Sequence, residues 1–118
     1  MTIVDTSVWI DHFRSGNDRL KGMLASESVS MHPFVVGELA CGGLKNRSQI
    51  LADLNSLPLA VPANHGEVLQ LIEKHRLWGK GIGWIDAHLL ASALISKSYI
   101  WSMDKRLALV ASALHIST

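Results

Sequence analysis

The sequence predicts an α/β fold with a central parallel sheet, and three observations carry this prediction. Short segments with the character of strands recur at residues 2 to 5, 28 to 31 and 99 to 102. Each leads into a segment with helical periodicity, and such alternation is typical of a parallel sheet covered on both faces. The segment "WIDAHLLASALISK" from residue 84 is apolar nearly all round, as a helix buried within a domain should be. We therefore expect a single domain over residues 1–118.

The other elements are expected between these segments. Pro33 near the first turn and Gly42-Gly43 at the end frame a helix over "PFVVGELACGG". The glycine loop "GKGIG", residues 79–83, lacks a phosphate-binding pattern and is expected to be a flexible entry to the apolar helix. Further elements are a helix over 48–57, a candidate strand over 59–62, a helix from Asn64 to about Trp78, and a helix over "KRLALVASAL".

Composition excludes several classes of protein. With 118 residues, 48% hydrophobic and 18% charged, the chain has the composition of an ordinary globular domain. The one cysteine, Cys41, cannot form an internal disulfide, and no Cys/His spacing indicates zinc. Asp5 and Asp11 interrupt the N-terminal apolar run, which argues against a signal peptide, and no segment has membrane-spanning length. We expect a soluble, cytoplasmic protein without a membrane partner.

Four acids occupy positions where a charge needs an explanation. Asp5 ends the first strand and Asp104 follows the last, at the edge where parallel sheets bind ligands. Glu38 is the only charged residue of an apolar helix, and Asp86 is the only acid among the apolar residues of another. An unpaired carboxylate costs several kcal/mol to bury. Because the local sequence offers no cation, these acids are expected to share a partner.

Three of these acids also have a structural interpretation. Asp5 and Asp104 could be N-cap residues of the helices that follow them. Asp86 would favour the helix dipole from its place in a first turn. Glu38 has no such explanation, and the occurrence of four acids at one edge favours a function.

Four facing carboxylates indicate a site for a hard divalent cation. The acids would repel one another without it, and oxygen ligands select Mg²⁺ or Mn²⁺. Such a site suits phosphodiester hydrolysis, because a metal lowers the pKa of bound water and stabilises charge on the phosphate. Neighbouring hydroxyls that could orient the carboxylates or hold waters belong to Thr6, Ser7 and Ser102.

The charge balance favours a polyanionic substrate. The net charge is +1, but with the four site acids set aside only six acids face eleven Lys and Arg residues. Three of these cations lie next to the proposed motifs and are expected to contact backbone phosphates: Lys80, Lys105 and Arg106. For any single cation, ordinary solvated surface charge is an alternative.

Histidines and tryptophans are assigned structural roles. The six histidines show no metal-ligand spacing. Trp9, Trp84 and Trp101 are expected in the core or a dimer interface rather than as base-stacking platforms, and Trp78 beside the glycine loop could be either.

Four segments, taken together, resemble a known family. "VDTSVWID", "VVGELACG", "WIDAHLLASA" and "WSMDKRL", in this order, are similar to the four acidic motifs of PIN-domain nucleases. They are most similar to those of the VapC toxins of bacterial toxin–antitoxin pairs. The resemblance covers essentially the whole chain and implies a PIN-like α/β/α sandwich. It implies Asp5, Glu38, Asp86 and Asp104 as the metal-binding and catalytic acids. Ser102 stands where the family usually has Thr and keeps the hydroxyl.

The same resemblance implies an activity and partners. It implies a Mg²⁺- or Mn²⁺-dependent endoribonuclease that is the toxin of a type II pair, an RNA substrate, a homodimer, and a VapB-like antitoxin with a segment in the catalytic groove. Trp9, Phe13 and the helix over 48–57 are candidate docking surfaces. A housekeeping RNA-processing nuclease and a non-catalytic interaction module of the same fold remain alternatives. A phospho-receiver or aspartyl-phosphatase is disfavoured, because "DTS" supplies neither adjacent acids nor Asp-x-Asp.

Overall fold

The structure, a computed structural model, describes all residues 1–118 as three strands and seven helices, which confirms the α/β class. In chain order the elements are β1 (Thr2–Val4), α1 (Thr6–Ser15), α2 (Asp18–Ala25), β2 (Val29–Ser30), α3 (Pro33–Ala40), α4 (Arg47–Asn55), α5 (His65–His75), α6 (Trp84–Ser96), β3 (Tyr99–Trp101) and α7 (Lys105–Ala113).

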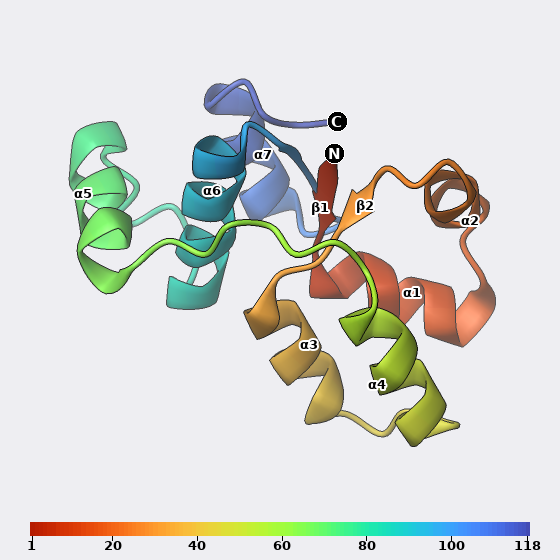
Figure 1. The fold of residues 1–118 in the computed structure, drawn as a ribbon. Helices are drawn as coiled ribbons and strands as arrows, with labels where there is room; N and C mark the ends of the chain where they lie inside the picture. The colour runs from red at the N-terminus through yellow and green to blue at the C-terminus, as the bar shows by residue number, and fades with distance from the viewer.

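The sheet is parallel throughout and has β1 at its centre. The strand order is β2-β1-β3, with Ile3 paired to Ser30 on one side and to Ile100 on the other. Figure 1 shows α5, α6 and α7 on one side of the sheet and α1 and α2 on the other, with α3 and α4 beyond the end where β1 enters α1. This arrangement is the α/β/α sandwich that the resemblance implied.

The core is built from the central strand and the apolar helix α6. Ile3 and Val4 of β1 are completely buried, as are Leu89 and Leu90 of α6. Each large aliphatic side chain that is fully buried contributes about 1.5 to 3 kcal/mol. The expectation of a buried helix from residue 84 is therefore confirmed. The packing of α6 in the core also sets where its first turn lies relative to the edge of the sheet. No helix of the structure is long and apolar enough to cross a membrane.

Two local predictions differ from the structure. The candidate strand over 59–62 is only a single bridge between Met31 and Leu59. Pro58 and Pro62 flank this segment and lack the N–H that a longer ladder would require. Helix α2 had not been predicted, although its signal is present in the N-cap Asn17, whose side chain accepts from the Leu20 N–H.

The four tryptophans are placed differently from one another. Trp9 is only 3% exposed and belongs to the core, so it is not available as a docking surface. Trp101 is partly buried, and its ring lies under the Arg19 guanidinium at 4.1 Å. Trp78 and Trp84 are 59% and 40% exposed. A core or dimer-interface role was expected for Trp84; its exposure excludes the core, and a dimer interface stays a prediction.

His32 generates a prediction about stability against pH. Its side chain is buried, and its Nδ1 accepts from the Phe34 N–H at the start of α3. Burial, with a smaller contribution from His88, lowers the pKa of His32 from 6.5 to about 4. Stability is fully present above pH 6.5 and is lost as pH falls towards 4, by up to about 3 kcal/mol, because only the unfolded chain binds the proton readily. Denaturant unfolding at a series of pH values measures this slope.

His32→Asn keeps an N-cap acceptor and removes the titration. We expect this variant to be less stable at pH 7 but to have a flatter profile between pH 6.5 and 4. His115→Asn, at an exposed position, is the control and should leave the slope unchanged. A wild-type slope in His32→Asn would contradict the assignment.

Candidate functional site

Asp5 is fixed at the end of β1 by a dense set of hydrogen bonds. Its backbone N–H donates to the Trp101 carbonyl at 2.9 Å, which ties the ends of β1 and β3 together. Its Oδ1 accepts from the Thr6 N–H at 2.8 Å. Its Oδ2 accepts from the hydroxyls of Ser7 at 2.9 Å and Ser102 at 2.7 Å. The carboxylate is only 6% exposed, and these charge-assisted bonds replace its lost hydration.

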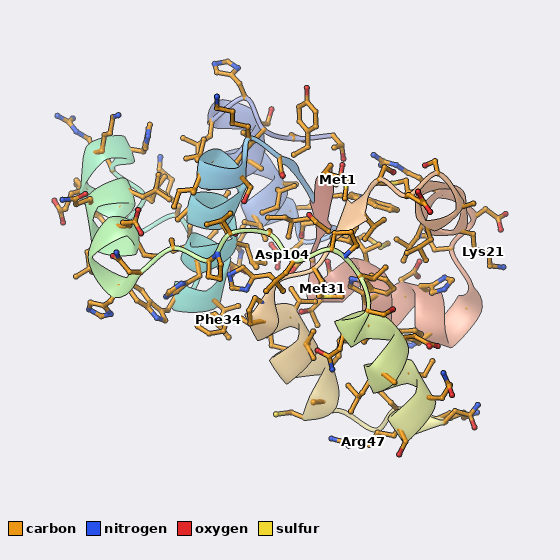
Figure 2. The ribbon with its side chains drawn as sticks, in the orientation of Figure 1. Met1, Lys21, Met31, Phe34, Arg47 and Asp104 are labelled. Atoms are coloured by element: carbon orange, nitrogen blue, oxygen red, sulfur yellow. The ribbon has the colours of Figure 1, made fainter.

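Asp104 is connected to Asp5 through Ser102. The Asp104 N–H donates to the Ser102 hydroxyl at 3.0 Å, and that hydroxyl donates to Asp5. The Asp104 Oδ1 accepts from the Arg106 N–H at 2.9 Å and the Leu107 N–H at 3.2 Å, which makes Asp104 the N-cap of α7. Its Oδ2 has no protein partner. Figure 2 shows Asp104 near the centre of the view and the cations Lys21 and Arg47 at its margin.

Glu38 and Asp86 approach from α3 and α6. The Thr6 hydroxyl donates to the Glu38 Oε1 at 2.8 Å, so Thr6 connects the start of α1 to the last turn of α3. The Asp86 Oδ2 accepts from the Gly83 N–H at 3.1 Å in the first turn of α6. The Glu38 Oε2 and the Asp86 Oδ1 have no hydrogen-bond partner. The structural role expected for Asp86 is thus present, and it leaves one oxygen free.

The charges of the other three site acids act on Asp86. Burial raises the pKa of Asp86, and the charges of Asp5, Asp104 and Glu38 raise it further, while the hydrogen bond from Gly83 opposes the shift. No cation offsets this repulsion, since the only ion pair of the chain joins Lys21 to Asp18. The sheet edge therefore concentrates negative charge that the protein itself does not neutralise.

The donor set fits a hard divalent cation. No three of the His, Cys, Asp and Glu side chains converge closely enough to form a metal-holding group in this structure. The connections that the structure shows among the four carboxylates are the Asp5–Ser102–Asp104 hydrogen bonds and the charges that act on Asp86. Asp86, Asp104 and Glu38 each keep one carboxylate oxygen without a protein partner, and oxygen ligands of this type suit Mg²⁺ or Mn²⁺.

The three cations expected to contact phosphate are not equivalent. Lys80 and Arg106 line one cleft of about 400 Å³ between the end of α5 and α7, whereas Lys105 does not. None of the three side chains takes part in an ion pair with the protein.

A cluster of aromatic rings beside the acids was missed by the sequence reasoning. The rings of Phe34 and Trp84 both lie 4.7 Å from the ring of His88, and both side chains are more than a third exposed. Phe34 precedes Glu38 by one helical turn, and Trp84 begins the helix that carries Asp86. A usable signal was present, because both rings stand in the first turns of the two helices with an unexplained acid.

A second cleft begins at Glu38. It measures about 670 Å³ and lies between α1, α3 and α4. Ile10, Phe13 and Ile50 are among its apolar lining residues, and Arg14 and Lys45 add positive charge. Phe13 and the helix over 48–57 thus contribute to one groove that reaches an acid of the site.

The fold and the site define an α/β domain with a carboxylate-rich site at the carboxyl ends of parallel strands. The family model described as the PIN domain matches residues 2–113. Two relatives, both named Ribonuclease VapC32, come from Mycobacterium tuberculosis strains CDC 1551 / Oshkosh and ATCC 25618 / H37Rv. Each is 44% identical over 108 residues, which cover 91% of this chain and 87% of the relative. The chain therefore belongs to the PIN-domain family, and within it to the VapC-type ribonucleases.

The repulsion at Asp86 generates a prediction about stability. Because the pKa of Asp86 is raised on folding, ionisation destabilises the folded protein at pH values above that pKa, and the penalty disappears as pH falls towards 3.8. Asp86→Asn keeps an oxygen for the Gly83 N–H and removes the charge. Its melting temperature in metal-free buffer at pH 7 should equal or exceed that of wild type, and the difference should vanish near pH 3.

Asp18→Asn is the control for this measurement. Asp18 is an exposed acid outside the site, so its neutralisation relieves no repulsion and should not raise the melting temperature. Early melting of Asp86→Asn at pH 7 would mean that the acid serves the fold rather than the site.

Proposed function

We propose that this chain is a Mg²⁺- or Mn²⁺-dependent endoribonuclease that acts as the toxin of a type II toxin–antitoxin pair. The observation that supports it most is the group of four acids at one sheet edge, which repel one another and have no protein cation. The relatives named Ribonuclease VapC32 support the ribonuclease class.

Each acid has a role that follows from its position. Asp5, Glu38, Asp86 and Asp104 would hold the metal through carboxylate oxygens, and the metal, when bound, supplies an activated water and neutralises charge on the scissile phosphate. The Ser7 and Ser102 hydroxyls fix the rotamer of Asp5 by donating to one oxygen. Such supporting hydrogen bonds orient metal ligands.

Thr6 and Gly83 hold the two helical acids in the same way. Thr6 donates to one oxygen of Glu38, and the Gly83 N–H donates to one oxygen of Asp86. Each side chain is then restricted to few rotamers, and its second oxygen would be available to the metal. Pre-organisation of this kind reduces the entropy lost when the metal and the phosphate bind.

The first test of this function is RNA cleavage. The purified chain should cut unpaired RNA with Mg²⁺ or Mn²⁺ and stop in EDTA. Asp5→Asn, Glu38→Gln, Asp86→Asn and Asp104→Asn should each lower the rate at least about a hundredfold, which is the loss expected when several kcal/mol of charge stabilisation is removed. Gel-resolved cleavage of a labelled RNA measures the rates.

Glu73→Gln removes an exposed acid of α5 and is the matched control, with wild-type cleavage expected. Undiminished cutting in EDTA would end the metal proposal. Absence of cutting by a folded wild-type chain with either metal would favour the non-catalytic interaction module.

The groove that begins at Glu38 supports the proposed antitoxin partner. Its apolar lining would accept the nonpolar face of a partner segment, and Glu38 would pair with a basic residue carried on that segment. A segment bound there would reach the carboxylate site and block both metal and RNA. Homodimer formation is likewise proposed, and the oligomeric state in solution tests it.

The toxin role predicts growth arrest when the chain is expressed alone. Asp5→Asn should abolish the arrest, and co-expression with a small antitoxin encoded next to the gene should relieve it. Ile10→Asp places a charge in the groove and should weaken relief without weakening arrest, because Ile10 is 45% exposed and lines the groove but is not a proposed ligand. Colony counts under induction measure both effects.

Leu69→Asp is the matched control for the groove. Leu69 is 46% exposed on α5 and lines neither cleft, so relief should stay complete. A wild-type chain that cuts RNA in the tube but is harmless at high expression would favour the housekeeping nuclease.

A further inference from the structure

We propose that the cleft between the end of α5 and α7 holds one unpaired nucleotide of the RNA next to the cut position, with its base on the apolar floor and its phosphate on Arg106 and Lys80. This inference rests on the proposed ribonuclease function and names a part of its substrate site. It separates Lys80 and Arg106, which would read a nucleotide, from Lys105, which would only add charge.

The cleft has the size and lining of a pocket for a small organic group. Its volume of about 400 Å³ lies within the range of roughly 300 to 1,000 Å³ that is usual for ligand pockets. Leu77, Val110, Ala113 and Leu114 are among its apolar lining residues. A flat nucleobase can be desolvated against such a floor, whereas a paired base inside a duplex could not enter the cleft.

The charge of the cleft has one sign. Lys80 and Arg106 line it together with His75, and no acid is among the lining residues. Neither the Lys80 ammonium nor the Arg106 guanidinium has an ion pair or a side-chain hydrogen bond within the protein. Two unpaired cations above an apolar floor match the chemistry of a nucleotide, because the guanidinium plane can stack on a base and both cations can bind phosphate.

The cleft is joined to the carboxylate site through Arg106. The Arg106 N–H donates to Asp104 at 2.9 Å, while the Arg106 side chain lines the cleft. One residue therefore contacts a proposed metal ligand with its backbone and the proposed nucleotide with its side chain. A phosphate held by the guanidinium would consequently neighbour the phosphate that is cut.

The glycine loop, residues 79–83, leaves space for the Arg106 side chain in the cleft. Gly81 has a φ of +79°, and a Cβ built on it would lie 2.6 Å from the Arg106 Cδ. A larger residue at this position would therefore strain the backbone and displace the arginine. The loop that the sequence assigned to flexibility alone has a second role, which is to accept the Arg106 stem.

The charge distribution favours RNA over a protein occupant. A second copy of the chain carries a net charge of +1, and a protein occupant would have to place an exposed acid and an apolar side chain together over the cleft. A nucleotide supplies the negative charge and the flat apolar group in one unit.

Binding of short RNA oligonucleotides in EDTA tests the proposal without cleavage. The probes are one unpaired RNA that the wild-type chain cuts with Mn²⁺, and a set of the same RNA in which each nucleotide in turn is abasic. For the wild-type chain, one abasic position next to the cut should weaken binding about tenfold, since base stacking is worth about 1 to 3 kcal/mol. Fluorescence anisotropy measures the dissociation constants.

The variants then locate the base. Arg106→Ala and Gly81→Ala should bind the intact RNA about as weakly as wild type binds that abasic RNA, and should lose the distinction between the two. Lys105→Ala is the matched control, because it removes the same charge from the adjacent position of α7 outside the cleft. It should weaken both RNAs equally, reduce the salt slope by about 1, and keep the distinction.

Three outcomes overturn the proposal. The first is that no abasic position matters, and the second is that Arg106→Ala and Lys105→Ala have the same effect on both RNAs. The third uses Leu109→Asn, which alters an exposed lining residue without disturbing the core. If this variant changes the molar mass in solution but leaves RNA affinity unchanged, the cleft is a protein interface. Cleavage that persists with no abasic effect would refute only this inference, whereas a folded wild-type chain that cuts no unpaired RNA with Mg²⁺ or Mn²⁺ would refute the proposed nuclease.

Discussion

The parallel pairing of β1 with β3 is the constraint on which the rest of the site depends. The register sets Val4 opposite Trp101, so the residues that follow the two strands emerge side by side. Asp5 and Ser102 are 97 positions apart in the chain and are nevertheless joined by a 2.7 Å hydrogen bond. A shift of this register would remove the contact and would also move the Asp5 N–H away from the Trp101 carbonyl.

Two acids of the site, Asp86 and Asp104, also stabilise the first turn of a helix, and the two roles are compatible because a carboxylate has two oxygens. Asp104 uses Oδ1 to cap α7, and Asp86 uses Oδ2 on the Gly83 N–H. In each case the cap fixes the rotamer and leaves the other oxygen free. The structural interpretation of these acids therefore explains how they are positioned, but it does not account for their mutual repulsion, which adds to burial in raising the pKa of Asp86.

Local signals predicted the order of elements, and they failed where the outcome depends on contacts between distant residues. Pro33, Asn64 and the apolar pattern of α6 marked helices that the structure contains. Trp84 lies outside the core, and this could not be predicted because exposure depends on tertiary packing, which no local pattern reveals. The cleft of Lys80 and Arg106 joins residues from a loop and a helix that are separated by the whole of α6 and β3. The sequence placed Asp5 and Asp104 at the edge where parallel strands end, and the structure joins them there through Ser102. That all four acids form one metal site stays a prediction.

If the site holds the proposed metal ion, the segregation of charge makes RNA binding depend on that ion as well. Because the protein contains a single ion pair, its cations remain available to phosphate and its site acids remain uncompensated. A phosphate held by the Arg106 side chain would lie close to Asp104, because the Arg106 N–H donates to that acid. At short range the negative charge of Asp104 opposes the approach of the phosphate. A bound divalent cation would lower the negative charge of the site and weaken that repulsion, while leaving the distant cations unchanged. Productive binding of RNA and binding of metal are therefore expected to be coupled by electrostatics, and the unpaired cations would hold RNA close to the site even before the metal completes it.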